Sequence, residues 1–516
     1  MNFLLTLIQA VGLGCASAAA GRRVMHYLQL ESYQLPGYIK SVKRNAMRAL
    51  IPTIAMAAVG VAALKVSGLF GLALLLEALT AALLTWQATK EKAKKPFVVT
   101  ERVKRLIAVH AAVNTVVALA LLLISPTLAY LMPAFEPALL MLAAIAAAPM
   151  EKHIAGQFVK DAQARLAAQP KLIKIGITGS YGKTSTKFLL RDILSVKYNV
   201  LATPSSFNTT MGVTRVIREQ LTPAHQVFIA EMGARHVGDI KELVELVHPQ
   251  MGLITSVGPQ HLDTFGTIER VRDTKYELID GLPKDGTAIF ARDGAICEEL
   301  FNRCTLEKKY KPGMLVDAKD MACGPWGTRF TLVDVQTGEE ASCQTRLLGE
   351  HSISNLLLCC TAARALGMTL PEIALGVSRC QPVEHRLELL DGGAGVSIID
   401  DAFNANPVGA QCALRVIKAF PGRRIIITPG MVELGGKEDE FNRTFGQQMA
   451  GSVDIAILVG KKHTQPIVEG LTKAGFPQEN IHVVGSLEES TTLLHSMMRA
   501  GDVVLYENDL PDNYSE

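Results

Sequence analysis

Five long apolar runs fill the first 150 residues, and they limit how this chain can fold more than any other feature. They cover residues 2–20, 49–66, 69–87, 106–124 and 137–150. An α-helix rises about 1.5 Å per residue, so each of the first four can cross a bilayer core of roughly 30 Å. The fifth run is short and spans only with help from residues 131–136, or lies partly at the interface. We therefore predict a transmembrane domain of about five helices over residues 1–150.

The first apolar run could also be a cleaved signal peptide. However, no Lys or Arg precedes it, and the basic pair Arg22-Arg23 follows it. A signal peptide normally has a positively charged start before its apolar stretch. We therefore expect the first run to be retained as a helix.

Two basic segments lie between the apolar runs and predict the orientation of the helices. Because loops rich in Lys and Arg stay on the cytoplasmic side, both segments should face the cytoplasm. With five crossings, the N-terminus and the turns near Gly68 and Pro133 lie outside. Everything after residue 150 then lies in the cytoplasm, and the protein is a multi-pass protein of the inner (plasma) membrane. The basic residues are Arg22, Arg23, Lys40, Lys43, Arg44 and Arg48 in the first segment and Lys90, Lys92, Lys94, Lys95, Arg102, Lys104 and Arg105 in the second.

Three polar residues interrupt the apolar runs. Glu77 lies in the middle of the third run, and His110 and Asn114 lie one helical turn apart in the fourth. Such residues avoid lipid, so they must face a bundle interior or a wet groove. They either bond one helix to another or line a groove that receives a polar head group.

Charge and cysteine content exclude two classes of function. The formal net charge is only +3, and most of the excess Lys and Arg lies in the two basic segments, so nucleic-acid binding is not expected. The nine cysteines show neither CxxC pairs nor histidines at zinc spacing. We therefore expect buried, reduced cysteines instead of disulfides or structural zinc.

From residue 171 onward, short β-branched runs alternate with amphipathic stretches, which indicates α/β structure with a parallel sheet. A strand at 172–178 runs into a glycine loop, and a helix follows at 187–196. Glycines let backbone N–H groups converge on a polyphosphate, while a lysine can bridge its β- and γ-phosphates and a threonine can ligate Mg²⁺. The order predicts an ATP site, although the loop is one residue shorter than the usual phosphate loop. The loop is Gly179, Ser180, Tyr181, Gly182, Lys183, Thr184 and Ser185.

Three further polar residues follow the next predicted strands. A strand at 226–230 ends in Glu231, one at 251–257 leads to His261, and a helix at 267–282 carries Lys275. The carboxyl end of a strand beside a phosphate loop is where a metal ligand belongs. Each residue alone is ordinary, so the prediction rests on their combination.

The last part of the chain again alternates strands with helices. Strands are expected at 396–399, 424–428, 455–459 and 503–506, which is typical of a Rossmann-like domain. We therefore predict a linker at 151–170, a P-loop ATP-binding central domain at 171–383 and a C-terminal domain at 384–516.

Six motifs in a fixed order make residues 171–499 resemble the Mur ligase family, and most closely its D-alanyl-D-alanine-adding branch. The resemblance implies an ATP-dependent amide ligase that uses two Mg²⁺ ions. It implies that Lys183 and Thr184 hold the phosphates and the first Mg²⁺ together with Glu231, and that His261 binds the second Mg²⁺. It also implies that Lys275 is carbamoylated, that Asn355 contacts adenine, and that Arg386 and Asp401 complete the nucleotide site at the hinge. The motifs are 178–184, 231–233, 258–262 with Lys275, 349–355, Arg386, and 400–407.

The chain departs from the family pattern at several positions. Ser352 stands in place of the usual Asn, and Ala402-Phe403 in place of Ser-Tyr. The end at 506–512 lacks the basic KGSR-like motif, which leaves the incoming amino acid open. The soluble domain that binds a UDP-linked sugar peptide in the family is missing, and the five apolar runs occupy its place.

The expected reaction is addition of an amino acid or dipeptide to a cell-wall peptide precursor through an acyl phosphate. The acceptor is either lipid-linked, which would make membrane lipid a partner, or a soluble UDP-linked precursor used by a tethered enzyme. A membrane transporter with an attached NTPase is the main alternative. Against it, the chain has no LSGGQ-like signature, and its strand-end acid lies in Glu231-Met232-Gly233 instead of an Asp-Glu pair. A scaffold without catalysis is disfavoured because the expected catalytic set is intact: Lys183, Glu231, His261, Lys275 and Arg386.

Overall fold

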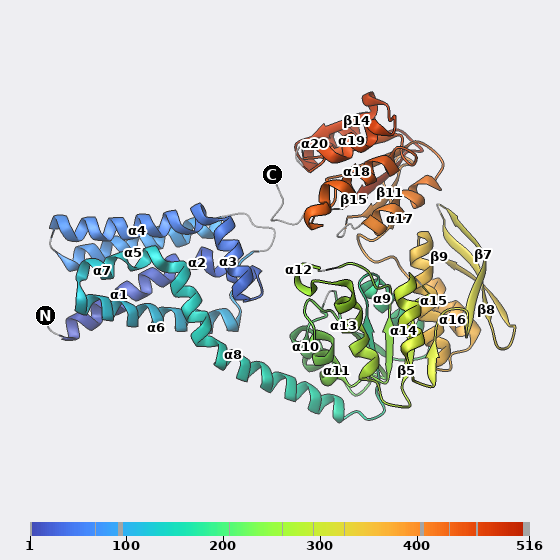
Figure 1. The fold of residues 1–516 in the computed structure, drawn as a ribbon, viewed down its shortest axis with the longest axis horizontal. Helices are drawn as coiled ribbons and strands as arrows, with labels where there is room; N and C mark the ends of the chain where they lie inside the picture. The colour runs from blue at the N-terminus through green and yellow to red at the C-terminus, as the bar shows by residue number, and fades with distance from the viewer. Residues whose placement is uncertain are drawn as a thin grey trace. The chain divides into compact units, whose positions relative to one another are not determined.

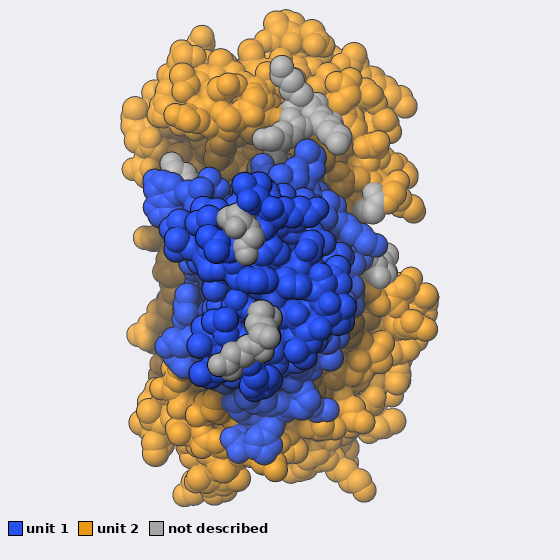
Figure 2. All heavy atoms as spheres, turned by 90° about the vertical axis from the view of Figure 1, so that its left-hand side faces the viewer, with its two compact units in different colours: residues 1–157 blue, residues 158–516 orange. Residues whose placement is uncertain are grey.

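The computed structural model describes residues 3–67, 69–90, 96–205, 207–260, 262–292, 294–324, 326–402, 407–432, 434–460 and 463–508. The chain forms two compact units, coloured separately in Figure 2. Unit 1 is Met1–Gln157, and unit 2 is Phe158–Glu516.

Unit 1 is a bundle of helices (Figure 1). Five stretches of it are long and apolar enough to cross a membrane, and the first four coincide with the predicted runs. The first basic segment forms two short helices, α2 and α3, which were not predicted. The elements are α1 (Phe3–Ala20), α2 (Arg22–Leu30), α3 (Leu35–Arg44), α4 (Ala46–Ser67), α5 (Phe70–Lys90), α6 (Glu101–Ile124), α7 (Pro126–Leu131), η1 (Met132–Phe135) and α8 (Glu136–Ala167).

The fifth apolar stretch differs from the prediction. The expected turn near Pro133 is wrong, because the chain turns at Ser125 and then continues through α7, the 3₁₀ segment η1 and α8. Pro133 is tolerated because it lies in the first turn of η1, where an N–H would have no helical partner. The apolar stretch therefore starts at Pro126. Residues 151–167 of the expected linker are the helical end of α8.

The polar residues of the apolar runs lie inside the bundle. His110 Nε2 lies 2.6 Å from Oε1 of Glu136, and the other oxygen of this carboxylate accepts hydrogen bonds from Ser17 (2.6 Å) and Asn114 (3.3 Å). All four side chains are buried. Their contacts join α1, α6 and α8, as the simpler of the two interpretations expects. Glu77 is also buried and packs against Gly60.

The central domain of unit 2 is built on a six-stranded sheet with the order β2-β3-β1-β4-β5-β6 and parallel pairing throughout. Alternate residues of a strand enter opposite cores: Val227 and Ile229 face one, and Phe228 and Ala230 the other. The strands are β1 (Ile173–Thr178), β2 (Val200–Ala202), β3 (Val227–Glu231), β4 (Met251–Ile254), β5 (Thr287–Phe290) and β6 (Lys308–Tyr310).

Helices cover both faces of the central sheet. Leu190 and Ile193 of α9 enter the first core, and Val213 and Ile217 of α10 enter the second. The helices are α9 (Lys183–Leu194), α10 (Thr210–Gln220), α11 (Asp239–Val247), α12 (Leu262–Phe265), α13 (Ile268–Asp280), α14 (Gly294–Arg303), α15 (Gly349–Ala365) and α16 (Leu370–Arg379).

A small antiparallel sheet of β7 (Val316–Gly324), β8 (Gly327–Asp334) and β9 (Glu340–Thr345) joins the central domain. It was not predicted. Its Phe330, Leu332 and Cys343 extend the first core. The sheet therefore enlarges that core instead of forming a separate domain.

The C-terminal domain has a second six-stranded sheet with the order β10-β11-β15-β12-β13-β14. Only β10 is antiparallel to its neighbour. The four predicted strands are present as β11, β12, β13 and β15. The elements are β10 (Glu388–Asp391), β11 (Ser397–Asp401), α17 (Pro407–Lys418), β12 (Arg424–Thr428), η2 (Gly435–Lys437), α18 (Glu438–Met449), β13 (Ile455–Val459), α19 (Gln465–Lys473), η3 (Gln478–Asn480), β14 (Ile481–Val484), α20 (Leu487–Met497) and β15 (Val503–Glu507).

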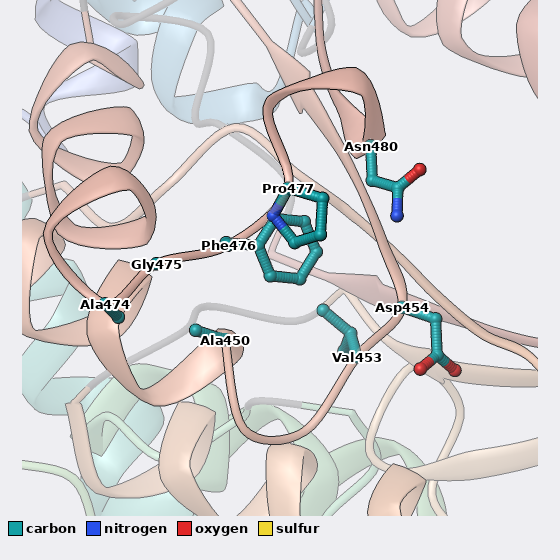
Figure 3. A pocket seen from close by; sticks show the side chains of 8 residues that line it. All are labelled: Ala450, Val453, Asp454, Ala474, Gly475, Phe476, Pro477 and Asn480. Carbon is teal, nitrogen blue, oxygen red and sulfur yellow. The ribbon is translucent and has the colours of Figure 1, made fainter.

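A surface pocket lies in this domain beside the C-terminal ends of α18 and α19 and the segment that precedes β14 (Figure 3). Its lining includes Phe476 and Pro477, with the polar residues Asp454 and Asn480. The Asp454 carboxylate is already bonded to Arg424 at 2.9 and 3.1 Å. The carboxylate in the pocket lining is therefore already paired and not free to bind a ligand.

Two glycines let α18 and α19 pack closely. A methyl group at Gly446 would collide with the carbonyl of Ile467, and one at Gly470 with the carbonyl of Arg443. We expect Gly470→Ala to lower the free energy of unfolding by about 1–3 kcal/mol, because backbone atoms cannot yield to an added methyl group. Thermal and denaturant unfolding would measure this. Gly451→Ala is the matched control, since a methyl group at Gly451 meets nothing within 4 Å; equal stability of both variants would contradict the packing described.

Candidate active site

The glycine loop joins β1 to α9 and requires glycine at two positions. Gly179 has φ +152° and Gly182 has φ +81°, both unfavourable for other residues. A methyl group at Gly179 would also collide with the hydroxyl of Thr255. Helix α9 begins at Lys183, four residues before the predicted start, with Gly182 as its N-cap. The free N–H groups and positive dipole of the helix therefore begin at the loop itself.

The loop is fastened to the segment that follows β4. The backbone N–H of Ser180 donates to the carbonyl of Ser256 (2.8 Å), and its hydroxyl donates to the carbonyl of Gly258 (2.9 Å). The hydroxyl of Tyr181 donates to the carbonyl of Pro259 (3.0 Å). The Gly258-Pro259 motif therefore holds the loop in place. His261, the predicted ligand of a second Mg²⁺, lies outside the described residues.

Lys183 lies over the loop, close enough to Glu231 and Arg386 for their charges to act on it. Its Nζ donates to the carbonyls of Gly179 (2.7 Å) and Ser180 (2.9 Å). Burial lowers the pKa of Lys183 to about 8, with Glu231 opposing the shift and Arg386 adding to it. The loop lysine, the acid after β3 and the hinge arginine thus share one site.

Glu231 is the centre of a buried polar cluster at the end of β3. Its Oε1 accepts hydrogen bonds from the Thr184 hydroxyl (3.1 Å) and the Asn208 amide (3.0 Å), and its Oε2 pairs with Nζ of Lys187 (2.9 Å). Glu231 and Lys187 are both almost fully buried. Lys187 and Asn208 were not predicted. Lys187 lies one helical turn after Lys183, and this spacing is the signal that could have found it.

We expect Glu231→Ala to lower the free energy of unfolding by about 3–5 kcal/mol, because it leaves the buried Lys187 ammonium without its carboxylate. The variant Glu231→Leu/Lys187→Met should recover most of this stability, since it removes both charges. Denaturant unfolding of the three proteins measures the effect. If Glu231→Ala were as stable as the unmodified protein, Lys187 would not depend on the pair.

Lys275 is a buried amine. It lies on α13, is 2% exposed, and has no hydrogen bond or ion pair with any residue that the structure describes. Burial and the charge of Lys183 together lower its pKa to about 7, against the opposing charges of Asp239 and Glu277. A large neutral fraction therefore exists near neutral pH, and the neutral amine is the form that reacts with CO₂.

Asn355 lies beside the phosphate loop. It is part of α15, and a methyl group at Gly182 would lie 2.8 Å from its side-chain oxygen. The structure thus brings Asn355 to the site, at the start of α9. The adenine contact implied by the resemblance stays a prediction.

Arg386 reaches the site from the segment that joins the two domains. Its neighbours His385 (φ +59°) and Leu387 (φ +47°) are both left-handed, a strained backbone found at functional sites. The N–H of Leu387 donates to Oδ1 of Asp401 (3.1 Å). Burial lowers the pKa of Arg386, while the charges of Asp401 and Glu231 oppose that shift. The predicted pair Arg386 and Asp401 is therefore brought together, whereas 403–406 lie outside the described residues.

The oxygen atoms of the site suit a magnesium nucleotide. The Thr184 hydroxyl and the Glu231 carboxylate are hard ligands, and Mg²⁺ is usually held by few protein oxygens together with substrate phosphates. Within the described part of the chain, no three His, Cys, Asp or Glu side chains form a group that could hold a metal ion.

Comparison with known proteins identifies the family. The profile of the Mur ligase middle domain matches residues 177–363, and that of the Mur ligase glutamate ligase domain matches residues 385–506. The UDP-N-acetylmuramoyl-tripeptide--D-alanyl-D-alanine ligase of Mycobacterium tuberculosis (strain CDC 1551) is 33% identical over 364 residues, which are 64% of this chain and 69% of that protein. The chain belongs to the Mur ligase family. This Mur ligase is an ATP-dependent ligase.

Other relatives agree with this assignment. The ligases with the same name from Bacillus subtilis and Escherichia coli are 28% and 30% identical over 338 and 294 residues. The matches cover 64% and 56% of this chain and 72% and 64% of those proteins.

Solved structures show the same fold. MurF of Acinetobacter baumannii aligns with a TM-score of 0.62 at 24% identity, over 69% of this chain and 77% of that one. MurF of Thermotoga maritima in complex with ADP aligns with a TM-score of 0.60 at 24% identity, over 69% and 80%. The predicted Mur-type α/β fold of the central and C-terminal domains is confirmed.

Proposed function

We propose that this Mur ligase adds an amino acid or dipeptide to the peptide of a cell-wall precursor, with ATP as the energy source. The observation that carries the proposal is the gathering of Lys183, Thr184 and Glu231 at the phosphate loop with Arg386 from the hinge. The relatives compared above are named for the joining of D-alanyl-D-alanine to a UDP-linked tripeptide. Residues 506–508 of this chain read Tyr-Glu-Asn, so this end lacks the basic KGSR-like motif of that branch. The identity of the incoming amine therefore stays open.

The chemistry begins with the carboxylate of the acceptor, which resists attack by an amine because oxide is a poor leaving group. Transfer of the γ-phosphoryl group of ATP converts it into an acyl phosphate. Lys183 and Arg386 neutralise charge on the transferred group, the main form of catalysis in phosphoryl transfer. The amine then attacks the acyl carbon, and amide, ADP and phosphate are formed.

We propose that Thr184 and Glu231 hold Mg²⁺, which supplies further neutralisation of phosphate charge when bound. We also propose that Lys275 reacts with CO₂ to give a carbamate. The buried neutral amine supports this, since an ammonium would repel a nearby cation and a carbamate would attract it. Mass spectrometry of the intact protein tests it, with a gain of about 44 Da that is absent from Lys275→Arg as the expected result.

We propose that unit 1 lies in the inner membrane and that unit 2 lies in the cytoplasm. Five stretches are long and apolar enough to span a bilayer. Large apolar side chains also cover the outside of α5, where Leu75, Leu79 and Leu83 are 51–58% exposed. Such a surface is stable in lipid and would aggregate in water.

The membrane unit suggests an acceptor that is itself lipid-linked. A single detergent assay that offers the enzyme a lipid-linked and a UDP-linked precursor, with each candidate amine, tests both the reaction and the acceptor. Preferential use of the lipid-linked precursor is expected. Exclusive use of the UDP-linked precursor would leave unit 1 as a tether, and ATP hydrolysis stimulated by a transported solute without any amide product would favour the transporter instead.

A further inference from the structure

Two carboxylates lie side by side at the carboxyl end of the C-terminal sheet. Asp401 ends β11 and Glu507 ends β15, and the two residues are direct register partners in adjacent parallel strands. They follow Ile399 and Leu505 by two residues, so they point to the same face of the sheet, the face covered by α17. The pairing comes from residues more than 100 positions apart in the chain.

Glu507 is a buried acid that the reaction described above does not use. It is 1% exposed, and within the described residues neither of its carboxylate oxygens has a hydrogen-bond donor other than the neighbouring acid. Burial raises the pKa of Glu507 well above its usual range, and Asp401 raises it further. Burial also raises the pKa of Asp401 to about 6. Two acids so placed cannot both ionise near neutral pH, so they hold one proton between them.

This acid pair is linked to the nucleotide site through the hinge. Asp401 accepts the N–H of Leu387, and its charge acts on Arg386. The charge of Arg386 in turn acts on Lys183 of the phosphate loop. The other titratable groups that act on the pair are Asp400, which lies 2.7 Å from His385, and Cys412 of α17.

We propose that Glu507 is a positioning residue which, by holding a proton shared with Asp401, leaves Arg386 available for the phosphates of ATP. With the proton in place, Arg386 faces one negative charge from the acid pair, besides that of Glu231. When the proton is lost, a second negative charge draws Arg386 toward the sheet and repels the triphosphate. ATP binding therefore weakens as pH rises, through a residue that does not itself touch the nucleotide. This inference rests on the nucleotide site assigned under the proposed function.

The test compares Glu507→Gln with the unmodified full-length protein in detergent. Glutamine has the same shape as glutamate and can donate a hydrogen bond to Asp401. Unlike glutamate, it cannot lose a proton and become negatively charged. The dissociation constant of ATP with Mg²⁺ is measured by calorimetry from pH 6.5 to 9.5, with KM for ATP and kcat as a second readout. Glu469→Gln is the control, because Glu469 pairs with Arg443 on the outside of the same domain.

We divide the dissociation constant of the unmodified protein by that of Glu507→Gln. This ratio should be near one at pH 6.5. It should rise about three- to tenfold by pH 9.5, which is typical for one charge near an anion site. Lys183 and Lys275 also titrate in this range, but both are present in each protein, so the ratio isolates Glu507. The ratio of kcat values should stay flat, and Glu469→Gln should show no trend in any ratio.

Stability supplies a second readout. The folded-state pKa of Glu507 is raised, so the folded protein holds a proton that the unfolded chain releases. The free energy of unfolding therefore falls as pH rises. Glu507→Gln should therefore unfold at a higher temperature than the unmodified protein at pH 8, with a smaller gain at pH 5. A flat ratio of dissociation constants would overturn the inference even if ligation is normal. Absence of any amide product from the unmodified protein, with the pH trend in ATP binding intact, would instead overturn the proposed function.

Discussion

Replacing Lys183 by alanine should lower ATP turnover by at least about a thousandfold, because the loop loses the charge that neutralises the transferred phosphoryl group. The side chain lies at the start of α9 and bonds to two carbonyls of its own loop. No other lysine of the described chain bonds to that loop. Release of ADP and of amide product, followed at saturating ATP, measures the loss.

Two controls separate this loss from a loss of folding. Lys473→Ala removes an exposed lysine at the end of α19 and should turn over at the normal rate. Thermal unfolding of Lys183→Ala should stay within a few degrees of the unmodified protein. Full activity of Lys183→Ala would show that the phosphate site has been placed wrongly.

Replacing Lys275 by alanine should lower turnover by about a hundred- to a thousandfold, and a short carboxylate such as acetate should partly restore it. The reason is that the proposed carbamate supplies an anion which an added carboxylate can replace in the space left by the side chain. The measurement is turnover with increasing acetate. Acetate should not restore Lys183→Ala, whose deficit is a missing cation.

The pH dependence of Lys275 gives a further check. Its folded-state pKa of about 7 lies below that of a free lysine, so the neutral amine accumulates as pH rises through 7. Enzyme depleted of CO₂ should therefore regain activity faster at pH 8 than at pH 6 when both buffers hold the same concentration of dissolved CO₂. A rate that is independent of pH, or no rescue by any carboxylate, would contradict carbamate formation.

Local patterns were enough to predict the glycine loop and seven of the fifteen strands in the described part of the chain. Parallel strands buried on both faces are continuous apolar runs, and 227–231 and 424–428 stand out for that reason. The loop is predictable because Gly179 and Gly182 adopt conformations that other residues avoid. Partners that come together only through tertiary packing leave no such pattern, which is why Asn208 and Glu507 were missed.

Two boundaries were misplaced for a physical reason. The fifth apolar stretch was expected at 137–150, extended at most by residues 131–136, with a turn near Pro133. The structure accommodates Pro133 in a single 3₁₀ turn between α7 and α8. Similarly, charge begins at Glu151, but α8 continues to Ala167 because Ala162 and Leu166 pack into the second core. Composition changes there, but the helix does not end.

The carboxylate that begins α8 also bears on how the bundle is made. In a bilayer, an isolated Glu136 would cost about 2.5–3.5 kcal/mol on insertion. Its three partners Ser17, His110 and Asn114 all precede it in the chain. In the membrane location that we propose for unit 1, these partners would be synthesised before Glu136, so the last segment would insert against a polar surface that is already present. Shortening the protein from its N-terminus should therefore impair insertion of this segment, whereas shortening it from the other end should not.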